Sequence, residues 1–312
     1  MKSVKKYLIL SFLIFTAAFV FCETKATVTK LPQRLFWRID GTDRTGKPSV
    51  IFVQGTIHVG NDKLFPLADE VVSKFVCANR VVGEISNEEM ENHEKAILRR
   101  TLLSFKKADG RLVTDYLSPE ECETAGEILG KSMFKKFSVF EPWVTQMAVS
   151  AALLNYTDLK SEKSVDQFFM NKAKECGIPV EGLDSLSDQL ELCTWGSYDY
   201  QVAVLKTMLR ELHGIPKEEY CSSVEDFFNM YLDDDVKKID ISIRHEYGEN
   251  VIELPEYEQY FREMNDVRNE KWAVKFKEYL DEGGTTFVFA GSAHFAFFRS
   301  VFYYMRLQGT LE

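Results

Sequence analysis

The sequence predicts an α/β (mixed α+β) fold in which a central β-sheet, built from both ends of the chain, carries a large helical insertion. Strand-like apolar runs occur within about 33–86 and 256–312, and residues 87–232 have mainly helical patterns. No linker of low complexity divides the 312 residues, which are 45% apolar and 28% charged, a globular composition. We therefore expect one domain over residues 27–312, with residues 178–184 adding to the sheet.

The first part of the chain has the pattern strand, strand, helix, strand. Residues 35–39 and 49–54 are apolar strand candidates, and the Gly- and Asp-rich stretch 40–47 between them is typical of a hairpin loop. Pro66 suits the first turn of a helix, and apolar residues at helical spacing follow it. Residues 80–85 (RVVGEI) predict another strand, which completes a βαβ unit with a right-handed crossover.

Helical patterns dominate the middle of the chain. The segment 118–121 (SPEE) has the serine cap, proline and acidic first turn of a helix start. Residues 164–175 are amphipathic, and the segment 178–183 after them predicts a short strand whose Pro179 favours an edge position. Further helices are expected at residues 186–192, 199–212 and 224–232.

The last part of the chain returns to the sheet. Residues 256–280 predict a long helix that two glycines, Gly283 and Gly284, bring to an end. Residues 285–290 (TTFVFA) are a continuous apolar run of the kind found in strands buried on both faces. An aromatic-rich helix is expected at residues 295–307.

Residues 1–22 have the layout of a secretory signal peptide. Three lysines precede an unbroken apolar run that ends at Phe21, and polar residues follow at once. Cleavage after Cys22 or after Ala26 would release an exported protein into a periplasmic or extracellular compartment. An uncleaved anchor or a lipid on Cys22 would instead tether the protein to a membrane, although the run is short for a span of roughly 20 residues.

The chain is acidic, with a formal net charge of −10, and removal of residues 1–22 would take away three lysines and no acidic residue. A surface of this sign repels phosphate backbones and anionic lipid. We therefore expect no nucleic-acid partner, and membrane contact only through an uncleaved signal or a lipid anchor.

The five cysteines after residue 22 form no CxxC pair, and their number is odd. This pattern predicts neither a zinc ribbon nor a disulfide framework. Buried free thiols are expected at Cys77, Cys122, Cys176, Cys193 and Cys221.

Two matching motifs follow the buried-type strands at the two ends of the chain. Each consists of a glycine, a small hydroxyl residue, one further residue and a histidine, in segments 55–58 (GTIH) and 291–294 (GSAH). Ligands bind outside the carboxyl ends of strands in open α/β sheets, and glycine there permits close approach of the backbone. We expect His58 and His294 to converge at one edge of the sheet, with Glu84 near the end of its own short strand.

Two histidines and one carboxylate form the ligand set of a catalytic divalent metal site. His58, Glu84 and His294 therefore predict a site for Zn, Mn or Co. Such an ion lowers the pKa of bound water to about 7 and polarises a carbonyl group. A single motif of this type would more simply be a turn with a hydrogen-bonded histidine, but here two occur in a chain with only five histidines.

With segments 66–69 (PLAD), 81–84 (VVGE) and 268–269 (RN), these motifs resemble the TraB/GumN family, which includes TIKI-type Wnt-inactivating proteases and is related to the ChaN and erythromycin-esterase proteins. The resemblance covers about residues 35–309, and the spacing of Asp166 is similar as well. It implies a mixed sheet flanked by helices and, in the TIKI branch, metal-dependent peptidase activity.

The resemblance also implies roles for individual residues. It places His58, Glu84 and His294 as catalytic or metal-binding groups above Gly55 and Gly291. Arg268 would face the site from the long helix and hold a carboxylate or an oxyanion. The alternative for Arg268 is an exposed ion pair with Glu263 or Glu270. Asp184 stands where the family usually has glutamate, whose side chain is one methylene longer. Whether the shorter aspartate contacts a ligand is therefore left open.

Three functions are compatible with these features. The first is a metal-dependent hydrolase that acts on a peptide or protein. The second is a non-catalytic protein that binds haem, a metal ion or a peptide in the same crevice. The third is a metal-free hydrolase in which a histidine is the general base.

Other polar motifs are expected to be structural. His93-Glu94 and His245-Glu246 lack the second histidine of HExxH, so these histidines, and His213, are expected at the surface or at helix ends. The hydroxyls of Thr56 and Ser292 are expected to bond their own backbone rather than a ligand.

Overall fold

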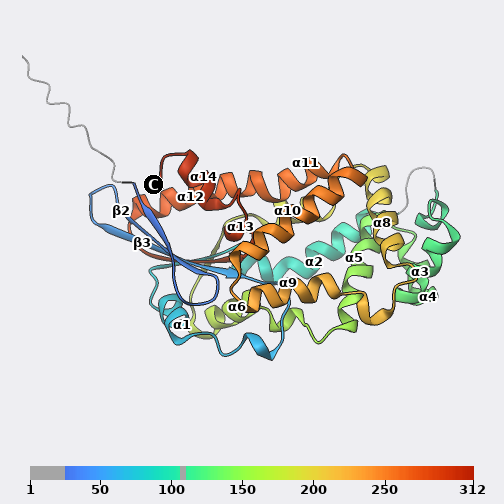
Figure 1. The fold of residues 1–312 in the computed structure, drawn as a ribbon, viewed down its shortest axis with the longest axis horizontal. Helices are drawn as coiled ribbons and strands as arrows, with labels where there is room; N and C mark the ends of the chain where they lie inside the picture. Colours follow the sequence, from blue (N-terminus) through green and yellow to red (C-terminus); the bar gives the residue numbers. More distant parts are fainter. Residues whose placement is uncertain (1–24, 106–109) are drawn as a thin grey trace, which may run out of the picture.

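Six strands form one mixed sheet in the part of the chain that the computed structural model describes, residues 25–105 and 110–312 (Figure 1). The order across the sheet is β1-β2-β3-β6-β4-β5, in which the β1-β2-β3 pairs are antiparallel and the other pairs are parallel. The strands are β1 (Thr27–Lys30), β2 (Phe36–Thr42), β3 (Pro48–Thr56), β4 (Arg80–Gly83), β5 (Val180–Gly182) and β6 (Gly284–Gly291). The predicted fold class is confirmed, and the predicted signal peptide at residues 1–22 lies outside the described residues.

Helices cover both faces of the sheet (Figure 1). On one face, Phe75 of α1 (Asp69–Val76) and Phe169 of α6 (Val165–Cys176) pack against Phe287 of β6. On the other face, Trp37 of β2 packs against Phe295 and Phe302, which belong to the last two helices. Because both faces are covered, β3 and β6 are continuous apolar strands, as the sequence predicts for residues 285–290.

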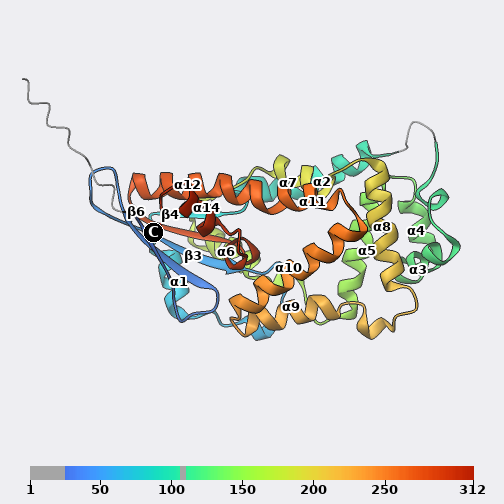
Figure 2. The ribbon, with the colours of Figure 1, turned by 45° about the horizontal axis from the view of Figure 1, so that its top comes forward.

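The remaining helices extend away from the sheet and give the molecule its elongated shape (Figures 1 and 2). Helices within residues 113–212 form a second core around Val113, Ala125, Val149 and Leu205, whereas the helices of residues 222–253 reach the core of the sheet through Tyr231 and Ile239. The remaining helices are α2 (Asn87–Leu103), α3 (Pro119–Leu129), α4 (Lys131–Phe137), α5 (Pro142–Leu153), α7 (Leu186–Cys193), α8 (Tyr198–Leu212), α9 (Ser222–Leu232) and α10 (Val236–Glu253).

Local sequence signals set several of the predicted element ends. Ser118 caps α3 in a capping box with Glu121, and Ser164 caps α6, which ends at a left-handed Gly177. β5 is an edge strand, as Pro179 predicts. The first helix differs from the prediction, because it begins at Asp69, where two acidic residues meet the helix N-terminus, rather than at Pro66.

Both predicted C-terminal helices are interrupted. The long one consists of α11 (Tyr257–Phe261), a π-helical turn (Arg262–Val267) and α12 (Arg268–Glu282). The last one divides into α13 (Ala293–Ala296) and α14 (Val301–Leu307), because Ser300 caps a new helix.

The five cysteines within the described residues are free, but the prediction that they are buried is wrong for three of them. Cys221 is buried and Cys122 is partly buried, whereas Cys77, Cys176 and Cys193 are exposed. Each of the exposed three lies at the C-terminal end of a helix, where the chain turns away from the core. None of the described helices has the length and hydropathy needed to span a membrane.

Ala26 joins the beginning of the described chain to its end. It is 3% exposed, its N–H donates to the carbonyl of Thr310 at 2.8 Å, and its carbonyl accepts from Glu312. Cleavage after Ala26 would remove this buried residue and both hydrogen bonds, whereas cleavage after Cys22 would keep them.

We therefore predict that export, if it proceeds by signal cleavage, yields a chain that begins at Glu23. Mass spectrometry of the intact exported protein measures this end directly. A mature chain that begins at Thr27 would contradict the structural role assigned to Ala26.

Candidate functional site

The two Gly-x-x-His motifs lie side by side because β3 and β6 are neighbouring parallel strands. Gly55 pairs with Ala290 and Thr56 pairs with Gly291, so both strands end at the same edge of the sheet. The N–H of Ser292 donates to the carbonyl of Thr56 at 2.9 Å, which ties the two turns together. Segments about 230 residues apart in sequence thus share one edge, as parallel pairing requires.

Three of the predicted site residues gather around Gly291. A Cβ atom placed on Gly291 would lie 3.2 Å from Oε1 of Glu84, 3.6 Å from Cδ2 of His294 and 3.7 Å from Nε2 of His58. The glycine is needed for this close approach rather than for an unusual backbone angle. Gly55 has a similar role, since a Cβ there would lie 3.2 Å from Ser292.

Glu84 follows β4 directly and lies at the centre of the cluster. Its Oε1 accepts the N–H of Gly291 at 2.8 Å, and its Oε2 accepts Nη2 of Arg268 at 2.7 Å and Nε2 of Gln189 at 3.3 Å. Burial alone would raise the pKa of Glu84, but the Arg268 guanidinium and the two imidazoles lower it to about 2. Glu84 is therefore an anion with both oxygens already bonded.

Arg268 forms a buried double ion pair rather than the exposed pair considered as an alternative. It is 8% exposed, and its Nε donates to Oδ2 of Asp184 at 2.8 Å while Nη2 bonds Glu84. The π-helical turn ends directly before Arg268, and its Met264 carbonyl also accepts from the guanidinium at 3.3 Å. Turns of this kind often occur at functional sites.

Asp184 holds Arg268 from the side away from the cavity. Its backbone N–H donates to the carbonyl of Glu84 at 2.8 Å, which extends the pairing of β4 with β5 and places the two carboxylates next to each other. Its Oδ1 accepts from Trp272 Nε1 at 2.8 Å. The shorter aspartate thus positions the guanidinium, and it is not among the residues that line the cavity.

His58 is held by a carboxylate that the sequence motifs do not include. Nδ1 of His58 lies 3.1 Å from Oδ2 of Asp166, and Oδ1 of Asp166 accepts the Thr56 hydroxyl at 2.5 Å. The expectation that the Thr56 hydroxyl bonds its own backbone is therefore wrong, because this hydroxyl anchors Asp166. The Asp166 carboxylate raises the pKa of His58 to about 9. The His58 side chain is 70% exposed, so solvent screens part of this attraction.

His294 has the opposite environment. It is 6% exposed, its ring packs 4.4 Å from that of Trp272, and its Nδ1 lies 2.7 Å from Oδ1 of Asn269. The Asn269 amide nitrogen donates to the Arg299 carbonyl at 2.8 Å, which turns the amide oxygen toward His294. Nδ1 is therefore the protonated nitrogen and Nε2 carries the lone pair. Burial lowers the pKa of His294 to about 3, and Arg268 adds to the effect.

A cavity of about 300 Å³ opens beside this cluster. Its polar side includes His58, Glu84, Asp166 and Arg268, whereas His294 lies outside the lining. His93, expected at the surface, is half-buried in the wall, because α2 runs along the cavity. The rest of the lining is mainly apolar, with an amide and a thiol: Ile85, Met90, Met170, Gln189, Leu192, Cys193, Met264 and Phe289.

His58, Glu84 and His294 are residue types that bind divalent cations, but their side chains are not arranged to share one ion. Two imidazoles and a carboxylate are a ligand set for Zn or related ions. His58 Nε2 lies 4.0 Å from Glu84 Oε1, and no group of three or more His, Cys, Asp or Glu within residues 25–105 and 110–312 is placed to hold a metal ion. Bound metal would need movement of these side chains, which the exposed His58 permits.

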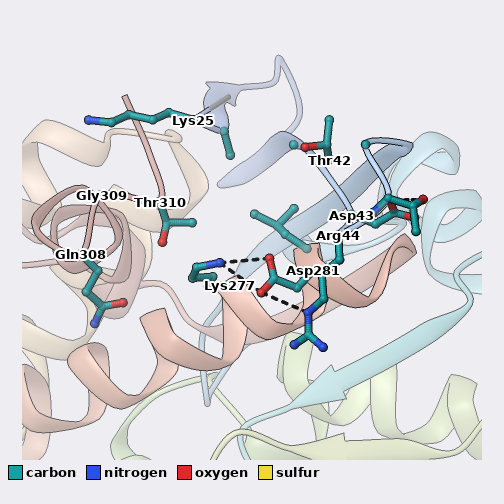
Figure 3. A pocket seen from close by; sticks show the side chains of 14 residues that line it. Lys25, Thr42, Asp43, Arg44, Lys277, Asp281, Gln308, Gly309 and Thr310 are labelled. Carbon is teal, nitrogen blue, oxygen red and sulfur yellow. Dashed lines mark hydrogen bonds and ion pairs between the residues drawn. The ribbon is translucent and has the colours of Figure 1, made fainter. Parts of the chain in front are cut away.

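A second hollow of about 530 Å³ lies between the β2–β3 turn, α12 and the C-terminal residues (Figure 3). Lys277 and Arg44 both approach the carboxylate of Asp281 there, at 3.0 and 3.7 Å. Because these charges compensate one another and neither Gly-x-x-His motif reaches the hollow, the 300 Å³ cavity is the better candidate site.

Of the other two histidines, His213 ends α8 and its Nδ1 lies 2.9 Å from the Thr124 hydroxyl, whereas His245 is exposed on α10 beside Glu249. Both positions agree with the prediction of surface or helix-end residues.

Comparison with known proteins gives two matches. The model of the TraB/PrgY/gumN family matches residues 35–311. An uncharacterized protein of Treponema pallidum (strain Nichols) is 27% identical over 308 residues, which cover 94% of this chain and 88% of that protein. No solved structure matches the chain significantly.

We predict that the two site histidines titrate far apart in metal-free protein. In an NMR titration His58 should lose its proton near pH 9, while His294 stays neutral down to at least about pH 5. Asp166→Asn should lower the pKa of His58 toward 6.5, because the largest cause of the shift is removed. Equal titration of both rings near 6.5 would contradict the assigned contacts.

These shifts also predict the sign of the pH dependence of folding. His58 adds stability that is complete below pH 6.5 and is lost as pH rises toward about 9, since its proton binds the folded state more tightly. His294 acts in the opposite sense, because the folded protein holds it neutral. As pH falls below 6.5 the unfolded chain binds a proton at His294 and the folded protein does not, so stability decreases.

Arg268→Gln should destabilise the protein by about 3–5 kcal/mol, because two buried carboxylates lose their shared cation. The matched control is Arg38→Gln, whose exposed pair with Asp40 is worth less than about 1 kcal/mol. Urea unfolding of both variants measures the difference. Equal stability of the two variants would show that the Arg268 pairs contribute no more than surface contacts.

Proposed function

The chain belongs to the TraB/PrgY/gumN family, and on this premise we propose that its paired Gly-x-x-His site is the active centre of an exported, TIKI-like metal-dependent hydrolase that cleaves peptides. One observation carries the proposal. Both histidines are anchored through Nδ1, by Asp166 and Asn269, on either side of a buried glutamate.

This anchoring is typical of histidines that bind metal ions. A metal-ligating histidine usually donates one ring N–H to a carboxylate or a carbonyl, which fixes the tautomer and leaves the other nitrogen for the ion. His58 and His294 both have such a partner at Nδ1. Nε2 of each ring, together with Glu84, would hold the cation.

The charge balance of the cluster supports a cation as well. Glu84 and Asp184 share the guanidinium of Arg268, and Asp166 faces protonated His58, so three carboxylates meet two single positive charges. A divalent cation would compensate the excess negative charge in a partly buried site, where unpaired charge is costly. Metal binding would then displace the proton that His58 otherwise holds.

The chain's own residues account for the other parts of a hydrolase. When bound, the cation would supply an activated water and polarise the scissile carbonyl. Arg268 holds Glu84 in place through a rigid, charge-assisted hydrogen bond rather than gripping the substrate. Met90, Met170 and Leu192 provide an apolar wall for the non-reacting part of a peptide.

A metal-free hydrolase is the second candidate, and the contrast between the two histidines favours it. Groups whose environments push their pKa values apart can serve as acid and base in one site. Protonated His58 at the cavity would be the general acid, and neutral His294, which lies behind the lining, would be the general base through a bridging water. In this case Arg268 and protonated His58 together compensate the charge of Glu84.

Metal analysis of the purified protein tests the proposal. We expect a bound divalent cation whose affinity falls more than about tenfold in His58→Ala, His294→Ala and Glu84→Gln. His245→Ala is the matched control, because this histidine is exposed on α10. Turnover of a peptide library, with and without chelator, is measured on the same samples.

Each outcome selects one function. Chelator-sensitive turnover that the three substitutions abolish supports the metal-dependent hydrolase. Turnover that resists chelator but needs His294 replaces it with the metal-free mechanism. Metal bound at these residues without any turnover would instead indicate a binding protein.

A further inference from the structure

The C-terminal part of α2 carries an exposed apolar patch at a distance from the candidate site. Leu98, Leu102, Leu103 and Phe105 are 60%, 62%, 73% and 52% exposed. Phe105 also contacts the ring of Phe140, but three exposed leucines beside it in one short segment exceed the single exposed apolar residues of an ordinary surface and mark an interaction surface. We refer to residues 95–105 as the α2 tip.

The α2 tip is also basic in an otherwise acidic protein. Residues 95–105 contain three cations and no acidic residue, although the chain as a whole has a net charge of −10. Lys95, Arg99 and Arg100 are all exposed, and Arg100 donates to the Thr194 hydroxyl at 2.9 Å. Lys95 and Arg99 form no ion pair with any other described residue.

Helical spacing places these apolar and basic side chains next to each other. Leu98 and Leu102 are four residues apart and lie on one face, and Lys95 and Arg99 form a second such pair beside it. A helix with leucines and aromatic residues adjoining lysines and arginines is typical of attachment to a membrane surface.

The described chain covers only one side of α2, where this helix contacts α7 and β5. α2 has 17 residues and none of them is buried, whereas most helices in proteins gain their stability from an apolar face packed in a core. Its C-terminal end lies far from the sheet, near α8, toward the end of the elongated molecule that α3 and α4 form (Figures 1 and 2). An extended surface could therefore reach it.

We propose that the α2 tip docks onto a membrane that contains anionic lipids. Leu98, Leu102, Leu103 and the exposed part of Phe105 enter the interface, and Lys95 and Arg99 lie among the phosphate groups, whereas Arg100 keeps its bond to Thr194. The net charge of the protein repels such a surface, so docking is confined to this basic end. A symmetric contact between two copies fits less well, because it would bring Arg99 and Arg100 of one copy against those of the other.

Binding to vesicles tests this surface, with the full chain expressed in a bacterial host and purified through a C-terminal tag. We expect sedimentation with phosphatidylglycerol vesicles, weaker binding to phosphatidylcholine, and a decline with added salt. Leu102→Glu/Leu103→Glu should lower the partition coefficient at least about tenfold. The matched control is Ile241→Glu/Leu307→Glu, whose original side chains are 55% and 64% exposed on other helices.

Circular dichroism and thermal unfolding verify that both double variants fold, as expected for exposed positions. Lys95→Gln/Arg99→Gln should weaken binding to phosphatidylglycerol and reduce its salt dependence. Equal binding by the tip variant and the control, or no binding of the unchanged protein, overturns the proposal. Self-association that the tip variant abolishes, without any vesicle binding, would assign the surface to a second copy instead.

Discussion

The parallel pairing of β3 with β6 is the constraint on which the site depends. It places β6, the last described strand, directly between β3 and β4 of the βαβ unit and aligns Thr56 with Gly291. Two histidines from opposite ends of the chain therefore reach the same edge, and Glu84 reaches it from the neighbouring β4. Arg268 then fixes the glutamate through a buried ion pair that also includes Asp184. Local sequence brings each group to a strand end, and only the sheet order brings the groups together.

The two motifs match in sequence but not in chemistry. His58 is exposed beside an aspartate, which favours its protonated form, whereas His294 is packed on Trp272 and held neutral by Asn269. In both arrangements Nδ1 is already bonded to a neighbouring side chain, so Nε2 is the ring nitrogen that a metal ion could bind. The site thus combines one exposed, charged imidazole at the cavity with one buried, neutral imidazole behind it.

The parts of the site that lie on strand ends could be predicted from the sequence, because apolar runs identify strands and parallel strands end at one edge. Of the residues on helices, the family resemblance indicated Arg268, but the contacts of Asp166 and His93 could not be predicted. Asp166 bonds His58 from the first turn of α6, and His93 lines the cavity from α2. Helical periodicity shows that these helices exist, but it does not show which turn faces the sheet edge. The burial of Arg268 was equally undetermined, because a guanidinium next to acidic residues usually forms a surface pair.

The most direct measurement is ¹⁵N NMR of histidine-labelled protein during titration with Zn²⁺. If the two rings form one site, the Nε2 resonances of His58 and His294 will shift together and saturate at one equivalent, while His245 stays unchanged. A response confined to one of the two rings, or shared equally with His245, would contradict a common site around Gly291.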